Sequence, residues 1–336
     1  MDYALLGATG IRVSEICLGT MTFGNEADEP TARAIMDRAV DAGINFFDTA
    51  DIYNKGLTEE IVGRWLDGRR DNIVLASKVH FPSGDGPNDR GSSRRHILLG
   101  VEESLKRLKT DRLDILYLHH WDPNTDLEVS LRACEHLIAQ GKVLHIGVSN
   151  FSAWQVMKAL SVAALKGLSP LCCIQPMYNL VKRQVEVELL PLAEHEKISV
   201  FPYSPIGAGL LTGKYQQGEK GRLQDSAMYA ERYKNPAYAD TSQQFVAYAR
   251  ERGLSPAALA VAWVGSHPAV TAPIIGARNL QQFNDTLGCL DIHLTQEERA
   301  TISAFSIDPP LATDRESMGT TLAQLKTGAH AGGLPR

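Results

Sequence analysis

The segment that decides the fold consists of two apolar runs with a helical pattern between them. The runs read IVLASKV (residues 73–79) and LDILYLH (residues 113–119), and each is almost continuously apolar. Such continuity predicts strands buried on both faces of a parallel sheet. Between the runs, Ser93 can cap a helix in which Val101, Leu105 and Leu108 recur at helical spacing. The segment therefore predicts a strand, a helix and a second, parallel strand.

The same alternation repeats along the chain. Eight apolar runs are separated by helical patterns, and they are Glu15–Thr20, Ile44–Ala50, Ile73–Val79, Leu113–His119, Val143–Asn150, Cys172–Tyr178, Val200–Pro205 and Ala272–Gly276. Eight such units in a row predict an α/β protein with a (β/α)8 TIM barrel, whereas a doubly wound sheet needs fewer strands.

The segments outside this repeat complete the predicted architecture. Tyr3–Leu6 and Ile11–Ser14 flank a glycine-containing turn, which predicts a short N-terminal β-hairpin that closes the bottom of the barrel. We expect one barrel domain over residues 1–309 and a Gly- and Ala-rich tail over residues 310–336 that is partly disordered. Residues 206–240 predict a long loop at the active-site end, where it could fold over a bound cofactor.

Composition and charge exclude several classes of protein. The 336 residues carry a formal net charge of −5 with acids and bases interspersed, which argues against a nucleic-acid partner. No apolar run approaches the length of a membrane span, and the first residues lack a signal-peptide pattern. The five cysteines form no CxxC pair, which predicts reduced thiols and a cytoplasmic protein. No pattern indicates an interface, so the oligomeric state stays open.

Polar and ionisable residues stand at the ends of the apolar runs. They are Asp48, Lys78, His119, Ser149 with Asn150, Gln175, Ser204 and Gly276. In TIM barrels the active site lies at the carboxyl ends of the strands. A series of such residues at one rim is hard to explain by core packing, so we predict a functional site there.

Asp48, Tyr53, Lys78 and His119 are the candidate catalytic residues. A buried lysine needs a counter-charge, which Asp48 can supply. An ammonium about 4 Å from a phenol attracts the phenolate by about 4 kcal/mol at an effective dielectric near 20, or about 3 pKa units at most. We therefore expect Tyr53 to be acidified and to exchange a proton near neutrality. The alternative is a structural ion pair that joins two strands.

These residues lie in motifs that together resemble the aldo-keto reductase family. The motifs are LGTM (18–21), FDTADIY (47–53), ASK (76–78), YLH (117–119), IGVSNF (146–151), QPMYN (175–179), YSPIGAGLLTGKY (203–215) and IGAR (275–278). The resemblance runs from about Leu6 to Ile292. The pattern GLLTGKY (209–215) is similar to the branch that includes bacterial reductases and potassium-channel β subunits.

The resemblance implies an NADPH-dependent enzyme that reduces aldehydes or ketones to alcohols by hydride transfer. In the family, the tyrosine at the position of Tyr53 is the general acid, and the lysine at Lys78 lowers its pKa. Asp48 would pair with Lys78, and His119 would orient and polarise the carbonyl of a small-molecule substrate. Phe23, Tyr53, His119 and Trp121 are available to line the substrate pocket, although Trp121 could equally pack under the loop that follows His119.

The resemblance also implies a set of cofactor contacts. They are Gly19, Thr20, Met21, Asp48, Ser149, Asn150, Gln175, Tyr203, Ser204, Pro205, Ile206, Gly207, Gly209, Lys214, Gly276, Arg278, Gln282 and Asp285. Arg278 can grip a 2′-phosphate as a fork, which favours NADPH over NADH. Two positions depart from the family pattern: Met21 stands where many relatives carry Trp, and Asp285-Thr286 replaces a Glu-Asn pair.

The sequence also allows four other interpretations. Residues 7–10, GATG, imitate a Rossmann phosphate turn, but the third glycine is missing. The run HHWD (119–122) suggests a metal-dependent hydrolase, although neighbouring histidines on a strand diverge. Lys78 could form a Schiff base in a lyase. A cofactor-binding regulatory subunit with little turnover is the alternative from a different functional class.

Overall fold

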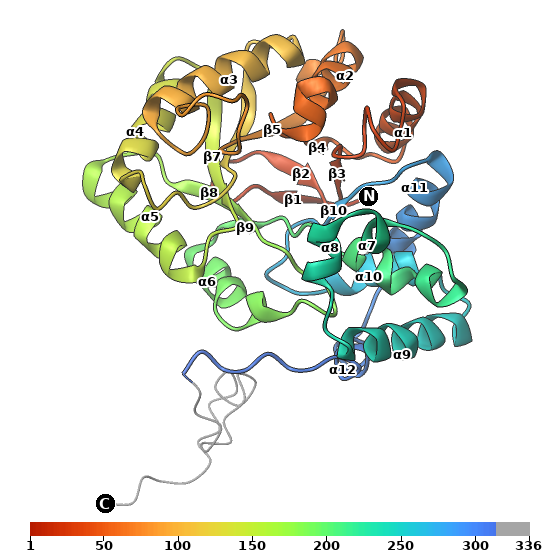
Figure 1. Cartoon of the computed structure of the whole chain (residues 1–336). Helices are drawn as coiled ribbons and strands as arrows, with labels where there is room; N and C mark the ends of the chain where they lie inside the picture. Colours follow the sequence, from red (N-terminus) through yellow and green to blue (C-terminus); the bar gives the residue numbers. More distant parts are fainter. Residues whose placement is uncertain (314–336) are drawn as a thin grey trace, which may run out of the picture.

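The computed structural model describes residues 1–313 and contains an eight-stranded sheet in which all neighbouring strands are parallel (Figure 1). In the order of the chain its strands are β3 (Cys17–Gly19), β4 (Phe46–Asp48), β5 (Val74–Val79), β6 (Leu113–Leu118), β7 (Val143–Ser149), β8 (Leu171–Gln175), β9 (Ser199–Val200) and β10 (Ile274–Ile275). Each overlaps one of the eight predicted runs. The sheet order runs from β10 through β3 to β9, so β3 to β9 lie in the order of the chain and β10 pairs with β3.

Backbone hydrogen bonds between the two ends of this sheet close the barrel. The amides of Thr271 and Ala272 donate to the carbonyl of Val200 at 2.9 and 3.3 Å, and the amide of Ile274 donates to Pro202 at 2.8 Å. Closure leaves no open sheet edge. The predicted (β/α)8 barrel is therefore confirmed.

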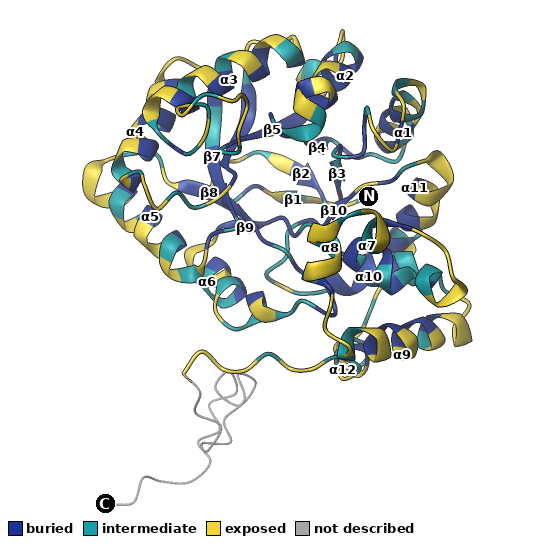
Figure 2. Cartoon of the chain, in the orientation of Figure 1, coloured by how far each residue is buried: buried dark blue, intermediate teal, exposed yellow. Residues whose placement is uncertain are grey.

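Helices surround the barrel and begin where capping residues stand. Asp28 accepts a hydrogen bond from the Thr31 amide at the start of α1, and Ser93 accepts one from the His96 amide at the start of α3. The helices are α1 (Glu29–Asp41), α2 (Leu57–Trp65), α3 (Arg94–Leu108), α4 (Leu127–Ala139), α5 (Ala153–Lys166), α6 (Leu189–Glu196), α9 (Ala237–Glu251), α10 (Pro256–Gly265), α11 (Leu280–Leu287) and α12 (Gln296–Ser303). Figure 2 shows α10 almost wholly buried, whereas α5 and α9 alternate between buried and exposed residues.

The N-terminal hairpin closes the amino end of the barrel. β1 (Tyr3–Leu5) and β2 (Arg12–Ser14) pair antiparallel, as predicted. Ser199, the first residue of β9, accepts a hydrogen bond from the Gly7 amide at 2.8 Å and donates one to the Leu5 carbonyl. Gly7 has a φ of +50°, and a Cβ there would lie 2.8 Å from the carbonyl oxygen of Cys172. This plug leaves the carboxyl ends of the strands as the open end.

The long segment between β9 and α9 forms only short helical elements. They are η4 (Gly207–Thr212), η5 (Lys214–Gln217), α7 (Arg222–Asp225) and α8 (Ala227–Arg232). Leu211 and Tyr233 are buried and attach this segment to the core. The predicted long loop is therefore present.

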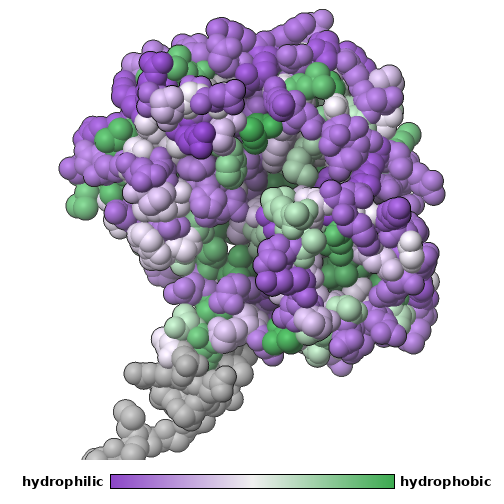
Figure 3. Space-filling model, viewed as in Figure 1, coloured by the Kyte–Doolittle hydropathy of each residue, from purple (hydrophilic) through white to green (hydrophobic). Residues whose placement is uncertain are grey.

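The surface and the chain end complete the description. On the face viewed in Figure 3, hydrophilic residues predominate, and apolar residues gather around a central hollow. No helix among residues 1–313 is long and apolar enough to cross a membrane. Most of the predicted tail over residues 310–336 lies outside the described residues.

Candidate active site

The alternation of side chains along the strands brings the candidate residues to one place. Phe46, Ala76 and Tyr117 belong to the apolar cluster that fills the barrel interior. Successive side chains on a strand point to opposite faces, so the residue two positions further on faces the interior again. That next interior position is Asp48 on β4 and Lys78 on β5, and His119 lies there just past β6. The apolar interior therefore ends in a polar layer at the open end of the barrel.

Lys78 is the centre of this layer. Its Nζ lies 2.5 Å from Asp48 Oδ2, 2.7 Å from the carbonyl oxygen of Thr49 and 3.1 Å from the hydroxyl of Tyr53. Lys78 is 1% exposed and Asp48 is 3% exposed. Two acceptors besides the phenol fix the ammonium, so its third hydrogen bond is directed at Tyr53.

Tyr53 is positioned by the sharp turn that follows it. It begins η1 (Tyr53–Gly56), in which Asn54 and Lys55 have positive φ angles of 48° and 56°. The Asn54 amide donates to the carbonyl oxygens of Phe23 and Met21 at 2.7 and 3.3 Å. Asparagine tolerates the left-handed conformation better than most residues. The turn is thereby tied to the connection after β3, which holds the phenol over Lys78.

His119 stands beside Tyr53. Its ring meets the Tyr53 ring edge-on at 6.2 Å between centroids and the Phe81 ring at 4.8 Å. The Asn150 amide donates to the His119 carbonyl oxygen at 3.0 Å, and the His119 Nδ1 is buried with no hydrogen-bond partner in the described structure. Burial, reinforced by the charge of Lys78, places the pKa of His119 well below its usual value. The imidazole is therefore neutral at neutral pH.

The pKa shifts of Lys78 and Tyr53 depend on burial as well as on the nearby charges. Burial lowers the pKa of Lys78, but the Asp48 carboxylate and Tyr53 outweigh it, and the net shift is upward. Burial raises the pKa of Tyr53 above 10, and the opposing effect of Lys78 only limits that rise. The expectation of an acidified phenol near neutrality is therefore wrong in its net direction. Both groups carry their protons at neutral pH, and Lys78 offsets part of the cost of forming a buried phenolate.

A hydrogen-bonded chain of side chains continues along the rim from Asp48. Gln175 Nε2 donates to Asp48 Oδ1 at 2.8 Å, and the Ser149 hydroxyl donates to the Gln175 carbonyl oxygen at 2.9 Å. The Asn150 amide donates to Ser149 Oγ, and Asn150 Oδ1 accepts from the Tyr203 hydroxyl at 2.7 Å. The structure thus brings together four of the residues that the resemblance implies as cofactor contacts, Ser149, Asn150, Gln175 and Tyr203.

The segment after β9 offers backbone groups in unusual conformations. Ser204, Gly207, Ala208 and Gly209 all have positive φ angles, between 56° and 88°. A Cβ on Gly209 would lie 2.6 Å from Cε of Lys214, so the lysine crosses directly over this turn. Turns of this kind direct backbone N–H groups to one side and suit a bound anion.

Cationic side chains gather next to this turn. Burial and the positive charge of Arg278 lower the pKa of Lys214, and Arg222 adds to the effect. Arg222 and Arg278 both form ion pairs with Glu26, at 3.1 and 3.7 Å. Lys214 and Arg278, predicted from the sequence to contact a cofactor, therefore lie in one cationic region.

The other predicted cofactor residues follow the same edge of the barrel. They are Gly19, Thr20 and Met21 at and after β3, Pro205 and Ile206 after β9, Gly276 after β10, and Gln282 and Asp285 on α11. A Cβ on Gly276 would lie 3.1 Å from the Gly19 carbonyl oxygen, so these two strand ends meet closely. Gln282 Oε1 accepts from the Arg278 amide at 3.3 Å, whereas Asp285 is exposed.

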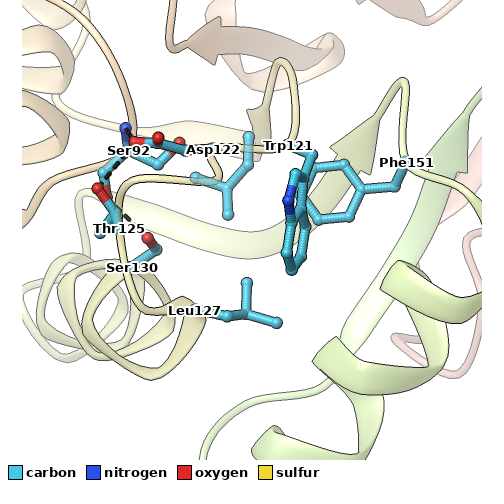
Figure 4. Close-up of a pocket in the computed structure, with 8 residues that line it drawn as sticks. Ser92, Trp121, Asp122, Thr125, Leu127, Ser130 and Phe151 are labelled. Carbon is cyan, nitrogen blue, oxygen red and sulfur yellow. Dashed lines mark hydrogen bonds between the residues drawn. The ribbon is translucent and has the colours of Figure 1, made fainter.

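One predicted pocket residue, Phe23, is placed differently from the expectation. Phe23 has no exposed surface and packs in the core around the barrel, so it lines no open pocket. Trp121 packs edge-on against Phe151 and Trp154, at 5.4 and 5.2 Å. A small pocket under the β6–α4 connection contains Trp121 and Phe151 but neither Tyr53 nor His119 (Figure 4). Trp121 therefore packs under a loop at the rim, and its place in the lining of the substrate pocket stays a prediction.

Sequence reasoning missed residues that the structure places at the site. Phe81 lies against His119, and its position just past the end of β5 was the signal that could have found it. Glu26 joins the two arginines, and no local pattern announces it. His120 Nδ1 lies 2.9 Å from the Trp121 carbonyl oxygen, and within residues 1–313 no three His, Cys, Asp or Glu side chains converge to hold a metal ion.

Comparisons with known proteins agree with this geometry. The family model described as "Aldo/keto reductase family" matches residues 15–307. A Bacillus subtilis protein named "Uncharacterized oxidoreductase YrpG" is 42% identical over 309 residues, which cover 88% of this chain and 93% of that protein. A rice protein named "Probable voltage-gated potassium channel subunit beta" is 39% identical, with 94% and 99% covered, and "Protein tas" of Escherichia coli is 34% identical, with 90% and 97% covered.

The barrel and the layer at its open end define an oxidoreductase of the TIM-barrel class. More particularly, the chain belongs to the aldo/keto reductase family.

Proposed function

We propose that this protein reduces an aldehyde or ketone to the alcohol with NADPH, and that Tyr53 is the general acid. The observation that carries the proposal is the buried Lys78 ammonium, which is fixed by Asp48 and Thr49 and hydrogen-bonded to the Tyr53 hydroxyl at 3.1 Å. If Lys78 served only as a structural ion-pair partner of Asp48, its third hydrogen bond would not need to be directed at the phenol of Tyr53.

The protonation states suit reduction. Tyr53 carries its proton at neutral pH because burial raises its pKa, so the phenol can donate to the oxygen of a carbonyl. Lys78 remains charged and stabilises the phenolate that this transfer leaves behind. The neutral His119 beside Tyr53 can donate a hydrogen bond to the same oxygen without competing for the proton.

The residues present fit a phosphorylated dinucleotide. The turn with positive φ angles at Ser204, Gly207 and Gly209 suits a pyrophosphate, and Lys214 crosses it. Arg278 would bind a 2′-phosphate, while Asn150 and Gln175 would hold the carboxamide at the other end. Bound in this way, NADPH would supply the hydride to the carbonyl carbon. The balance is one hydride to carbon, one proton from Tyr53 to oxygen, and a proton from solvent to restore the phenol.

The rice relative supports a second candidate, a cofactor-binding subunit with little turnover. That protein is named "Probable voltage-gated potassium channel subunit beta", and the two chains align over nearly their whole lengths. One experiment separates the candidates. Purified protein is mixed with NADPH and a panel of reactive aldehydes and α-dicarbonyls, and loss of reduced-nicotinamide absorbance is followed. Turnover that depends on the carbonyl is expected; tight NADPH binding without turnover on any of them would favour the subunit.

A further inference from the structure

Glu26 is the meeting point of three segments that are distant in the sequence. It lies in the connection between β3 and α1. Its Oε1 lies 3.1 Å from Nη2 and 3.2 Å from Nε of Arg222, which begins α7. The same oxygen lies 3.7 Å from Nη2 of Arg278, which follows β10. One carboxylate oxygen thus joins the long loop and the last strand end to the β3–α1 connection.

The charges around this carboxylate are unbalanced. Lys214, Arg222 and Arg278 are close enough that both arginines contribute to lowering the pKa of Lys214. Glu219 and Asp225 act on Lys214 in the opposite direction, but neither forms an ion pair with Arg222 or Arg278 in the part of the chain that the structure describes. Glu26 is therefore the acid that directly occupies the guanidinium groups of this region.

A carboxylate and a phosphate bind a guanidinium through the same donors. A ligand with a phosphate at Arg278 must displace Glu26 from that group or accept its negative charge nearby. A ligand with a hydroxyl there meets no such competition, because a carboxylate can accept a hydrogen bond from a hydroxyl. The presence of Glu26 thus opposes one kind of ligand and tolerates the other.

We infer that Glu26 is a specificity-determining residue, whose carboxylate competes with the 2′-phosphate for Arg222 and Arg278 and so restrains the preference for NADPH over NADH. The inference rests on the proposed function only in that the cationic region receives the adenosine end of a dinucleotide. Specificity of this kind is a difference of two affinities, so the test compares two ligands that differ in one phosphate.

The test measures the binding of 2′,5′-ADP and of 5′-AMP by isothermal titration calorimetry, with the full-length protein and its Glu26→Gln variant. The side chain is only half-buried, so the expected gain for 2′,5′-ADP is about 5- to 10-fold in Kd, and that for 5′-AMP is less than about 2-fold. The Glu26→Asp variant, in which the carboxylate is withdrawn by one methylene, should bind 2′,5′-ADP with an affinity between those of wild type and Glu26→Gln. The gain should shrink at high ionic strength.

Glu219→Gln is the matched control, because it removes one negative charge from the same loop without touching either arginine. It should change both affinities by less than about 2-fold, the size expected for a screened surface charge. A Glu26→Gln variant that binds 2′,5′-ADP no better than wild type, or that improves both ligands equally, would overturn the inference. If both fragments bind with this pattern but no carbonyl is reduced, only the reductase proposal fails. If wild-type protein binds neither fragment, both proposals fail.

Discussion

Replacing Lys78 by Met separates the structural and the chemical roles of the buried ion pair. The substitution leaves Asp48, which is 3% exposed, without its counter-ion. Removing one partner of a buried pair costs about 3–5 kcal/mol of unfolding free energy, because an uncompensated charge remains. The Gln175 amide still donates to Asp48 Oδ1 at 2.8 Å and offsets a part, so we expect a loss near 3 kcal/mol. The double variant Asp48→Asn/Lys78→Met should regain most of that loss.

The chemical role should respond differently. An ammonium 3.1 Å from the Tyr53 oxygen favours the phenolate by about 5 kcal/mol at an effective dielectric near 20. Asp48 opposes about half of this attraction, so the pair together favours the phenolate by about 2.5 kcal/mol, and the double variant should transfer hydride roughly two orders of magnitude more slowly than wild type. Lys78→Met removes the whole attraction and leaves the Asp48 charge, so it should be slower still. Hydride transfer should therefore remain slow in the double variant, although the double variant has regained most of its stability.

Two assays are needed, urea unfolding for stability and single-turnover oxidation of bound NADPH for the chemical step. A double variant that recovers the chemical step together with its stability would refute the chemical role of Lys78. A Lys78→Met variant that unfolds at the same urea concentration as wild type would refute its structural role.

Three further predictions follow from individual residues. Burial raises the pKa of Tyr53, so the rate of carbonyl reduction should stay constant through neutral pH and fall only as the pH passes that raised pKa, above 10. A fall of this rate near pH 7 would contradict the prediction. Asp51 is buried with both carboxyl oxygens unpartnered, and burial, with Glu59 adding to it, raises its pKa from 3.8 to about 7. Its folded-state pKa lies above the unfolded value, so ionisation costs stability progressively from about pH 4 to pH 7, up to about 4 kcal/mol. Asp51→Asn should remove this pH dependence, and parallel stability–pH curves for the two proteins would disprove it. Gly7→Ala should lower the unfolding free energy by about 1–3 kcal/mol without changing KM, because φ is +50° and the new Cβ lies 2.8 Å from a carbonyl oxygen; a changed KM at unchanged stability would show that the hairpin serves the site instead.

The barrel and its catalytic layer could be predicted because both follow from short-range patterns. Apolar continuity marks a parallel strand, and the residue that ends each run is the one that must face the open end. Asp48, Lys78 and His119 are therefore found from the sequence once eight strands have been counted, and the structure places them together with Tyr53. Ser93 at the start of α3 was predictable for a similar reason, because a cap is a local contact.

The features that sequence reasoning missed depend on packing between distant segments. The net pKa shift of Tyr53 is upward because burial outweighs the nearby charge, and burial is decided by loops that no single motif describes. Phe23 is aromatic and follows a strand, but the backbone of its own loop is held by Asn54, and its ring turns into the core. Glu26 meets Arg222 across 196 residues of chain, a separation at which local patterns carry no information.

Tyr53→Phe removes the proposed proton donor itself, and Tyr117→Phe, which removes another buried hydroxyl from the barrel interior, is its control. Single-turnover hydride transfer from NADPH to a reactive aldehyde is measured for both variants, together with the Kd of NADPH. We expect Tyr53→Phe to lose hydride transfer by roughly two orders of magnitude or more, as for removal of a general acid, while it binds NADPH within about threefold of wild type. Tyr117→Phe should retain both properties. Hydride transfer at the wild-type rate in Tyr53→Phe would contradict the assignment of the general acid and, with it, the proposed mechanism.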